Sequence, residues 1–461
     1  MIRRSQLVVF YSAALLAATG IFFLIRAAGL KLVPPGTANL PVVASVRDAP
    51  NVFPNVLVAL AVVVVAARVL ATLLGWLGQP QVMGEVIAGL LLGPSFFGWI
   101  APKAAAELFP PAVAPYLAVI AQAGVILFMF LVGLELDTDL LRQRTRASVA
   151  ISHASIVAPF LLGGALALWL YPRFAGAGVW FTPFALFIAA AMSVTAFPVL
   201  ARILTDTKMQ NSQLGVLALA CAAVDDVTAW CLLALVASVA RAQPGQALVT
   251  VGAAIAFTLF VLLVARKGAM WLVERRDRAG RTTEGMFATV CVSLFVTALV
   301  TERIGIHALF GAFLLGVVVP YDSALARDIR EKCEDLVVVL FLPVFFAFTG
   351  MRTQVGLLQD SAAWLACAVI VLVATVGKFG GSFLAARLTG SNAREAASLG
   401  ILMNTRGLME LVVLNVGLDL GVLSPALFAM FVLMAIVTTL ATTPILQVLM
   451  RRGRANGSAV A

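Results

Sequence analysis

Charged side chains are scarce in this chain of 461 residues. Asp, Glu, Lys and Arg together make up only 12% of it, whereas 62% of the residues are hydrophobic. A soluble globular domain carries about 25% charged residues, so this composition excludes that class. The hydrophobic residues fall in long runs, which is typical of an all-α polytopic membrane protein.

The motifs of common enzymes are also missing. The chain has no P-loop, no dinucleotide fingerprint and no HExxH, and its five cysteines show no CxxC or other metal-ligand spacing. We therefore predict a protein that is not an enzyme and holds no cofactor. His153 and His307 are the only histidines, and we interpret His307 as a helix-end residue rather than a pH sensor.

Hydropathy predicts about fourteen membrane helices. The apolar segments lie at 5–29, 54–77, 81–100, 113–136, 146–171, 178–204, 212–241, 247–273, 284–302, 305–320, 331–351, 362–388, 393–418 and 424–450. The first segment follows two arginines, as in a signal peptide. Its apolar stretch is longer than the hydrophobic region of such peptides, which favours an uncleaved helix.

The distribution of Lys and Arg predicts the orientation. Basic residues gather in alternate connections, and the most basic stretch is 266–281. Because cytoplasmic loops carry the excess of Lys and Arg, both termini are expected in the cytoplasm of a protein of the plasma (inner) membrane. We interpret 274–284 as a long cytoplasmic connection between two halves of the molecule. The net charge of +10 therefore indicates membrane orientation and not binding to nucleic acid.

Two adjacent carboxylates, Asp225 and Asp226, lie in the middle of the apolar stretch 213–240. One Asp at the centre of a membrane helix costs about 2.5–3.5 kcal/mol on insertion scales, so such residues usually serve ions or protons. The alternative is a pair that only joins helices by hydrogen bonds, for which one polar residue would suffice. The pair predicts an ion or proton site.

Two apolar segments contain polar breaks. Pro198 interrupts the stretch 192–200, where Thr195 lies one turn earlier, and Gly407 lies in the polar stretch 403–411. Paired interruptions in corresponding helices of two halves are typical of inverted-repeat transporters, whose ion site lies between the breaks. Ordinary bending at a proline is the alternative reading of the first break.

Other charges fall within apolar segments. Lys378 lies in the middle of 362–388, so it requires a carboxylate partner, and one of the two aspartates is the candidate. The alternative is a structural ion pair without a role in transport. Arg406 and Glu410 stand four residues apart, which favours a local pair that braces the broken helix. Glu85, near one membrane face, is a candidate funnel residue.

Several stretches together resemble the monovalent cation:proton antiporter-2 family. They lie at 81–95, 128–137, 193–204, 223–230, 310–316 and 403–410, and the resemblance covers residues 54–450. It implies a sodium/proton antiporter fold of 13–14 helices with inverted repeats, two crossed broken helices, a mobile core, dimerisation helices and a homodimer in the lipid bilayer. Residues 1–53 would form an extra helix and outer loop, and 451–461 a short basic tail.

The resemblance also implies roles for individual residues. Asp226 would bind a cation or a proton in turn, and Asp225 would be its companion, paired with Lys378. The helix crossing and its surroundings would hold Thr195, Pro198, Asn404, Thr405, Arg406, Gly407 and Glu410.

These expectations predict a secondary active transporter that exchanges Na⁺ or K⁺ for H⁺ by alternating access. A cation channel or gated K⁺ efflux route in the same fold is the alternative. An intramembrane aspartyl protease would need its two aspartates on different helices, and a transporter of organic anions would favour Arg and Lys at the membrane centre. The sequence does not distinguish Na⁺ from K⁺.

Overall fold

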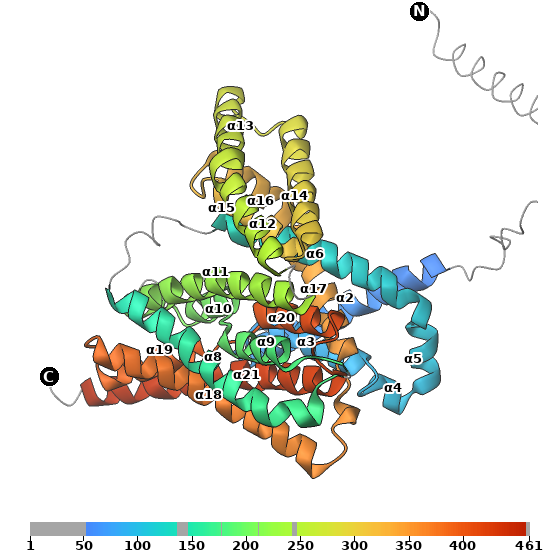
Figure 1. Cartoon of the computed structure of the whole chain (residues 1–461), viewed down its shortest axis with the longest axis vertical. Helices are drawn as coiled ribbons and strands as arrows, with labels where there is room; N and C mark the ends of the chain where they lie inside the picture. The colour runs from blue at the N-terminus through green and yellow to red at the C-terminus, as the bar shows by residue number, and fades with distance from the viewer. Residues whose placement is uncertain (1–51, 136–145, 177, 211, 242–246, 458–461) are drawn as a thin grey trace, which may run out of the picture. The chain divides into compact units, whose positions relative to one another are not determined.

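The computed structural model describes residues 52–135, 146–176, 178–210, 212–241 and 247–457. These residues fold almost entirely into α-helices (Figure 1). Within the described ranges the only β-structure is an isolated bridge between Ala175 and Leu423. The predicted segment 5–29 and the tail residues 458–461 lie outside the described residues.

Two sets of helices follow one another along the chain. The first set consists of α2 (Val52–Trp76), α3 (Gln81–Leu92), α4 (Phe97–Ile100), α5 (Pro102–Leu108), α6 (Ala114–Glu135), α8 (Arg146–Phe174), α9 (Phe181–Ser193), α10 (Phe197–Asp206), α11 (Gln213–Arg241), α12 (Ala247–Phe260) and α13 (Arg266–Ala279). The second consists of α14 (Glu284–Ile304), α15 (Ala308–Val318), α16 (Ala324–Leu336), α17 (Leu342–Arg352), α18 (Ser361–Leu388), α19 (Ala393–Met403), α20 (Leu408–Asp419) and α21 (Pro425–Gly457). Short π-helical turns join α12 to α13 and α16 to α17.

The predicted all-α polytopic architecture is confirmed. Every apolar segment predicted between residues 54 and 450 contains helix. In the described part of the chain, nine helical stretches are long and apolar enough to cross a membrane, and Phe181–Ser193 and Ala308–Val318 are shorter apolar helices. The protein is therefore a multi-pass membrane protein.

The prediction of a long connection at 274–284 is wrong in its first half. Helix α13 continues to Ala279, and only Gly280 to Thr283 form the turn into α14. Gly280 has a φ of 69°, and the Thr283 side chain accepts a hydrogen bond from the Met286 N–H at the start of α14. Hydropathy stopped the segment too early because Arg is polar but also a good helix former.

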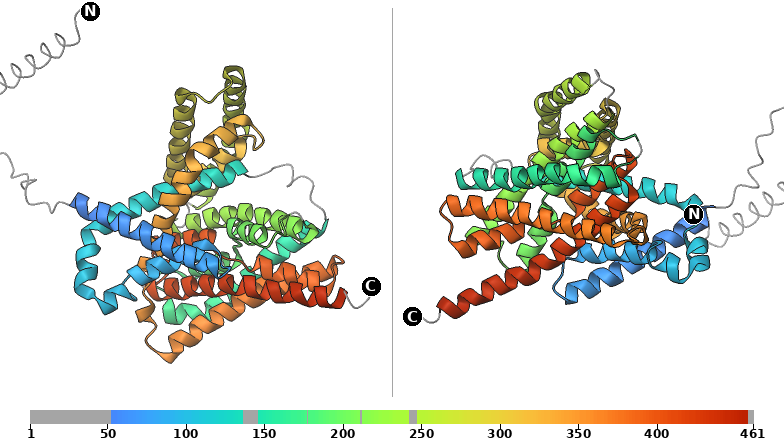
Figure 2. Two further views of the ribbon diagram at one scale, coloured as in Figure 1. Left: turned by 180° about the vertical axis from the view of Figure 1, so that it is seen from behind. Right: turned by 60° about the horizontal axis from the view of Figure 1, so that its bottom comes forward.

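The helices form two groups by their contacts. We call α8–α11 and α18–α21 the crossing group, since it contains both broken helices; its members pack mainly on one another. We call α2, α3, α6, α14, α15 and α17 the flanking group, which also packs mainly within itself. Figure 2 shows α18 and α21 of the crossing group running beside each other.

Glycines let helices of the flanking group touch through their backbones. A Cβ atom on Gly89 of α3 would lie 2.1 Å from the Ala347 carbonyl oxygen of α17. On another side of α3, a Cβ atom on Gly84 would lie 2.5 Å from the Ala71 Cα of α2. Such small-residue contacts are typical of tightly packed membrane helices. They hold α3 firmly between α2 and α17.

Candidate functional site

The first broken helix consists of α9 and α10. Helix α9 ends at Ser193, residues 194–196 are not helical, and α10 begins at Phe197. Pro198 therefore lies in the first turn of α10, where its missing N–H leaves no helical bond unmade. The prediction that Pro198 itself interrupts the helix is corrected: the interruption comes just before it, around Thr195.

The second broken helix consists of α19 and α20, and it crosses the first. Residues 404–407 are not helical, and the Ala196 N–H donates to the Thr405 carbonyl at 3.0 Å. A Cβ atom on Gly407 would lie 2.6 Å from Val199 Cγ2, so glycine permits this approach. The structure thus brings the two predicted breaks into direct contact.

Arg406 joins the two broken helices. Its guanidinium is fully buried and donates to the carbonyl oxygens of Ala191 and Met192, at the end of α9, at 3.0 and 2.9 Å. It also donates to Glu410 Oε2 at 3.0 Å. A cation at a helix C-terminus and an anion in the first turn of a helix both oppose the helix dipole. The ion pair therefore stabilises both the C-terminus of α9 and the N-terminus of α20.

Asp225 is a satisfied carboxylate. It is 1% exposed and accepts hydrogen bonds from Ser152 Oγ at 2.8 Å, Thr195 Oγ1 at 2.8 Å and the Ser155 hydroxyl. Lys378 Nζ lies 3.0 Å from Asp225 Oδ2 and also donates to Thr195 Oγ1. Hydrogen bonds that involve ionisable groups are the strong ones, so this network holds the side chains of Asp225 and Lys378 together.

Asp226 differs sharply from its neighbour. It is 3% exposed, and neither carboxylate oxygen makes a hydrogen bond with any residue that the structure describes. The backbone amide of Phe197, at the start of α10, lies close enough to interact electrostatically with it. The positive end of a half-helix therefore faces the carboxylate. Adjacent residues of a helix point about 100° apart, which explains why only one of the two reaches the serines.

Two further oxygen atoms near the crossing also lack a hydrogen-bond partner among the described residues. Asn404 Oδ1 and Thr405 Oγ1 are buried, and neither has a hydrogen-bond partner within the described ranges. Buried polar groups normally have partners. Oxygens of interrupted helices are typical ligands of Na⁺ in transporters. Carboxylate, amide and hydroxyl oxygens are all suitable ligand types for a monovalent cation.

Two residues of this site were not predicted from the sequence. Ser152 and Ser155, both on α8, hold the Asp225 carboxylate but were not predicted. A signal was present: two hydroxyl groups three residues apart lie on one face of a helix, inside the apolar segment 146–171.

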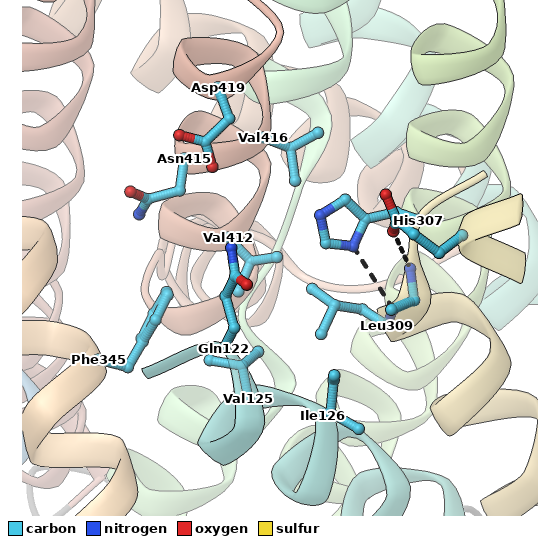
Figure 3. Close-up of a pocket in the computed structure, with 12 residues that line it drawn as sticks. Gln122, Val125, Ile126, His307, Leu309, Phe345, Val412, Asn415, Val416 and Asp419 are labelled. Atoms are coloured by element: carbon cyan, nitrogen blue, oxygen red, sulfur yellow. Dashed lines mark hydrogen bonds between the residues drawn. The ribbon is translucent and has the colours of Figure 1, made fainter. Parts of the chain in front are cut away.

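Two cavities lie where the crossing group meets the flanking group. The His307 cavity, of about 280 Å³, is lined by α6, α14, α15, α17 and α20. Figure 3 shows Gln122, His307, Asn415 and Asp419 around it. The predicted helix-end position of His307 is confirmed, because it caps α15 and accepts from the Leu309 N–H. Arg352 of α17 bonds both Asn415 and Asp419 of α20, at 2.9 and 2.6 Å.

The Glu85 cavity, of about 180 Å³, is lined by α2, α3, α6, α10 and α17. Adjacent residues of α17 face the two cavities: Phe345 lines the His307 cavity and Phe346 lines the Glu85 cavity. Their rings pack edge to face, with centroids 5.4 Å apart. Aromatic side chains therefore lie between the two cavities.

Comparison with known proteins gives consistent results. Residues 60–452 match the sequence model of the family described as "Sodium/hydrogen exchanger, transmembrane". The chain is 42% identical to the Na⁺/H⁺ antiporter NhaS4 of Synechocystis, over 85% of this chain and 96% of that protein. It is 38% identical to the cation/H⁺ antiporter 17 of Arabidopsis thaliana, over 88% of this chain and 49% of that protein.

The similarity extends to yeast and to a solved structure. The chain is 36% identical to the K⁺/H⁺ antiporter 1 of Saccharomyces cerevisiae, over 80% of this chain and 43% of that protein, so it spans about half the length of the plant and yeast relatives. The sodium proton antiporter MjNhaP1 of Methanocaldococcus jannaschii shares the fold, with a TM-score of 0.63, 15% identity and coverage of 86% and 99%. The predicted fold is thereby confirmed, and the chain belongs to the sodium/hydrogen exchanger family.

Proposed function

We propose that the protein exchanges a monovalent cation, Na⁺ or K⁺, for H⁺, and that Asp226 binds the two in turn. The observation that carries this is the contrast within the aspartate pair. Asp225 accepts from four side-chain donors, whereas Asp226 is equally buried and accepts from no side chain of the described residues. Relatives named as Na⁺/H⁺ and K⁺/H⁺ antiporters support the same activity.

Competition for one carboxylate explains the coupling. A proton and a metal cation each neutralise Asp226, so they exclude one another. Moving an unneutralised charge through an apolar barrier carries a large desolvation penalty, which disfavours the return of an empty site. The crossing group, held together by Arg406 and the Ala196–Thr405 bond, is suited to move as one body against the flanking group.

The structure also favours exchange over a channel. A channel needs a continuous route on which ions can occupy several sites at once. Here Phe345 and Phe346 lie between the two cavities, and Asp226 is almost completely buried. Access from one side at a time fits this arrangement better than an open route does.

The test is a proteoliposome assay with a pH-sensitive dye and gradients of Na⁺, K⁺, Li⁺ and Rb⁺. The Asp226→Asn variant should lose cation-driven proton flux while it stays folded, because it keeps its size but loses a titratable group. Asp322→Asn, which changes an exposed aspartate, is the matched control and should exchange normally. Full exchange by folded Asp226→Asn, or unitary channel currents in a bilayer recording, would contradict the proposal.

We further propose a homodimer in the plasma (inner) membrane, with both termini in the cytoplasm and no bound cofactor. The alternation of basic connections supports the orientation, and the family resemblance supports the dimer. Labelling of single cysteines at either terminus in intact cells checks the orientation. A purified protein that remains fully active as a monomer at every concentration would refute the dimer.

A further inference from the structure

Glu85 is a buried carboxylate that the exchange scheme does not yet use. It is 5% exposed and lines the Glu85 cavity. Within the described ranges no side chain or backbone group makes a hydrogen bond or close ion pair with it; Arg68 acts on it only as a more distant charge. A carboxylate without a hydrogen bond to the described residues therefore faces an internal cavity.

A structural role does not explain this carboxylate. The contacts that fix α3 are made by Gly84 against Ala71 and by Gly89 against Ala347, on either side of Glu85. An ionisable group without partners destabilises a buried position, and within membrane segments such groups usually mark the path of an ion or proton. Glycine contacts next to Glu85 thus fix its helix, whereas its own side chain makes no hydrogen bond to the described residues.

The Glu85 cavity also borders the transport site. Val199, in the first turn of α10, lines the cavity. Phe197, two residues earlier, places its backbone amide beside Asp226. Only the first turn of α10 therefore separates the cavity from the carboxylate that we assign to transport. In the same cavity lie the arginines of α2 and α10, Arg68 and Arg202, while the lining side chains of α6 and α17 are apolar.

We propose that Glu85 relays protons between the water on its side of the membrane and Asp226; the proposal rests on the exchange function above. A protonated Glu85 gives its proton to a water molecule, which gives a proton to the Asp226 carboxylate. Glu85 is left ionised, Asp226 becomes neutral and the total charge is unchanged. Arg68 and Arg202 line this cavity beside Glu85, whose carboxyl group binds a proton covalently.

The test compares Glu85→Gln and Glu85→Asp with Glu107→Gln, which removes an exposed carboxylate of α5. Each variant is measured in oriented proteoliposomes for exchange rate against pH on each side, for the KM of the cation and for thermal stability. Glu85→Gln should slow exchange by about a hundredfold or more, within the range that positioned proton-transfer groups supply. The pH profile should change on one side only, the cation KM should stay unchanged, and Glu85→Asp should restore most of the rate.

Three results would overturn the relay. Normal exchange by Glu85→Gln would show that Glu85 carries no proton. A raised cation KM with an unchanged pH profile would make it a cation ligand. A loss of activity that follows the folded fraction, without rescue by Glu85→Asp, would make it structural. A wild-type protein that fails to exchange, or an active Asp226→Asn variant, would instead refute the underlying function, so the two failures are distinguishable.

Discussion

The buried pair of Lys378 and Asp225 can be tested by removing each charge separately. Lys378→Met keeps the length of the side chain but leaves Asp225 without its counter-ion. Removing one partner of a buried pair costs about 3–5 kcal/mol. Three hydroxyl donors, from Ser152, Ser155 and Thr195, still reach the carboxylate. We therefore expect a loss at the lower end of that range, about 3 kcal/mol.

The opposite change should be more damaging. Asp225→Asn keeps an oxygen that can accept the hydroxyl groups, but it strands the Lys378 ammonium, which is 0% exposed. Lys378 then retains only neutral acceptors, chiefly Thr195. Because ammonium is strongly hydrated in water, the expected loss lies at the upper end, about 4–5 kcal/mol.

The double variant strands neither charge, because both members of the buried pair are then neutral. Its loss of unfolding free energy should be smaller than the sum of the two single losses by about 2–3 kcal/mol. A coupling of this size is typical of two residues in contact. Unfolding is followed for all four proteins in lipid nanodiscs. The control combines Asp225→Asn with Lys103→Gln, which changes an exposed lysine. In this control the two losses of stability should simply add. If the losses of the Asp225 and Lys378 single variants also simply add in their double variant, the two residues are not paired.

Two further substitutions test the packing of the crossing and of α3. Arg406→Lys should destabilise the protein by about 2–4 kcal/mol and slow exchange. The reason is that one ammonium cannot bond Glu410 and both α9 carbonyls as the guanidinium fork does. An Arg406→Lys variant as stable as the wild-type protein would contradict the assigned bonds. Gly89→Ala should lower stability by about 3 kcal/mol or more in the same unfolding assay, because its Cβ would meet the Ala347 oxygen at 2.1 Å. Gly252→Ala, whose Cβ meets nothing within 4 Å, should be neutral or stabilising, and equal effects would show that the contact is unimportant.

Much of the fold could be predicted from the sequence, because the membrane itself decides it. A segment long and apolar enough to span a bilayer has to be helical, so hydropathy locates the helices between residues 54 and 450. The importance of the aspartate pair could also be predicted, because ionisable groups inside a membrane helix are costly and usually serve a function. The partner of Lys378 could be narrowed to two candidates by charge alone, and the structure places it at Asp225.

The rest of the site depends on contacts between distant segments. Nothing in the local sequence around Arg406 indicates that its guanidinium ends α9, because its partners there are backbone carbonyls, which every residue has. The position of the first break was missed for a local reason: Pro198 is equally compatible with ending one helix and with beginning the next. The C-terminal end of α13 was not predicted because its polar residues were interpreted as an irregular connection.

The bonds between Arg406 and α9 also have a consequence for how the protein is made. The carbonyl of Ala191 is 215 residues ahead of the guanidinium that it bonds. Chains are synthesised at about 5–20 residues per second, so the C-terminal end of α9 exists for about 10–40 s before its partner has been translated. During that interval the carbonyl oxygens at the end of α9 lack the guanidinium that bonds them in the folded protein. The C-terminal end of α9 therefore gains its Arg406 bonds only after the second half of the chain has been synthesised.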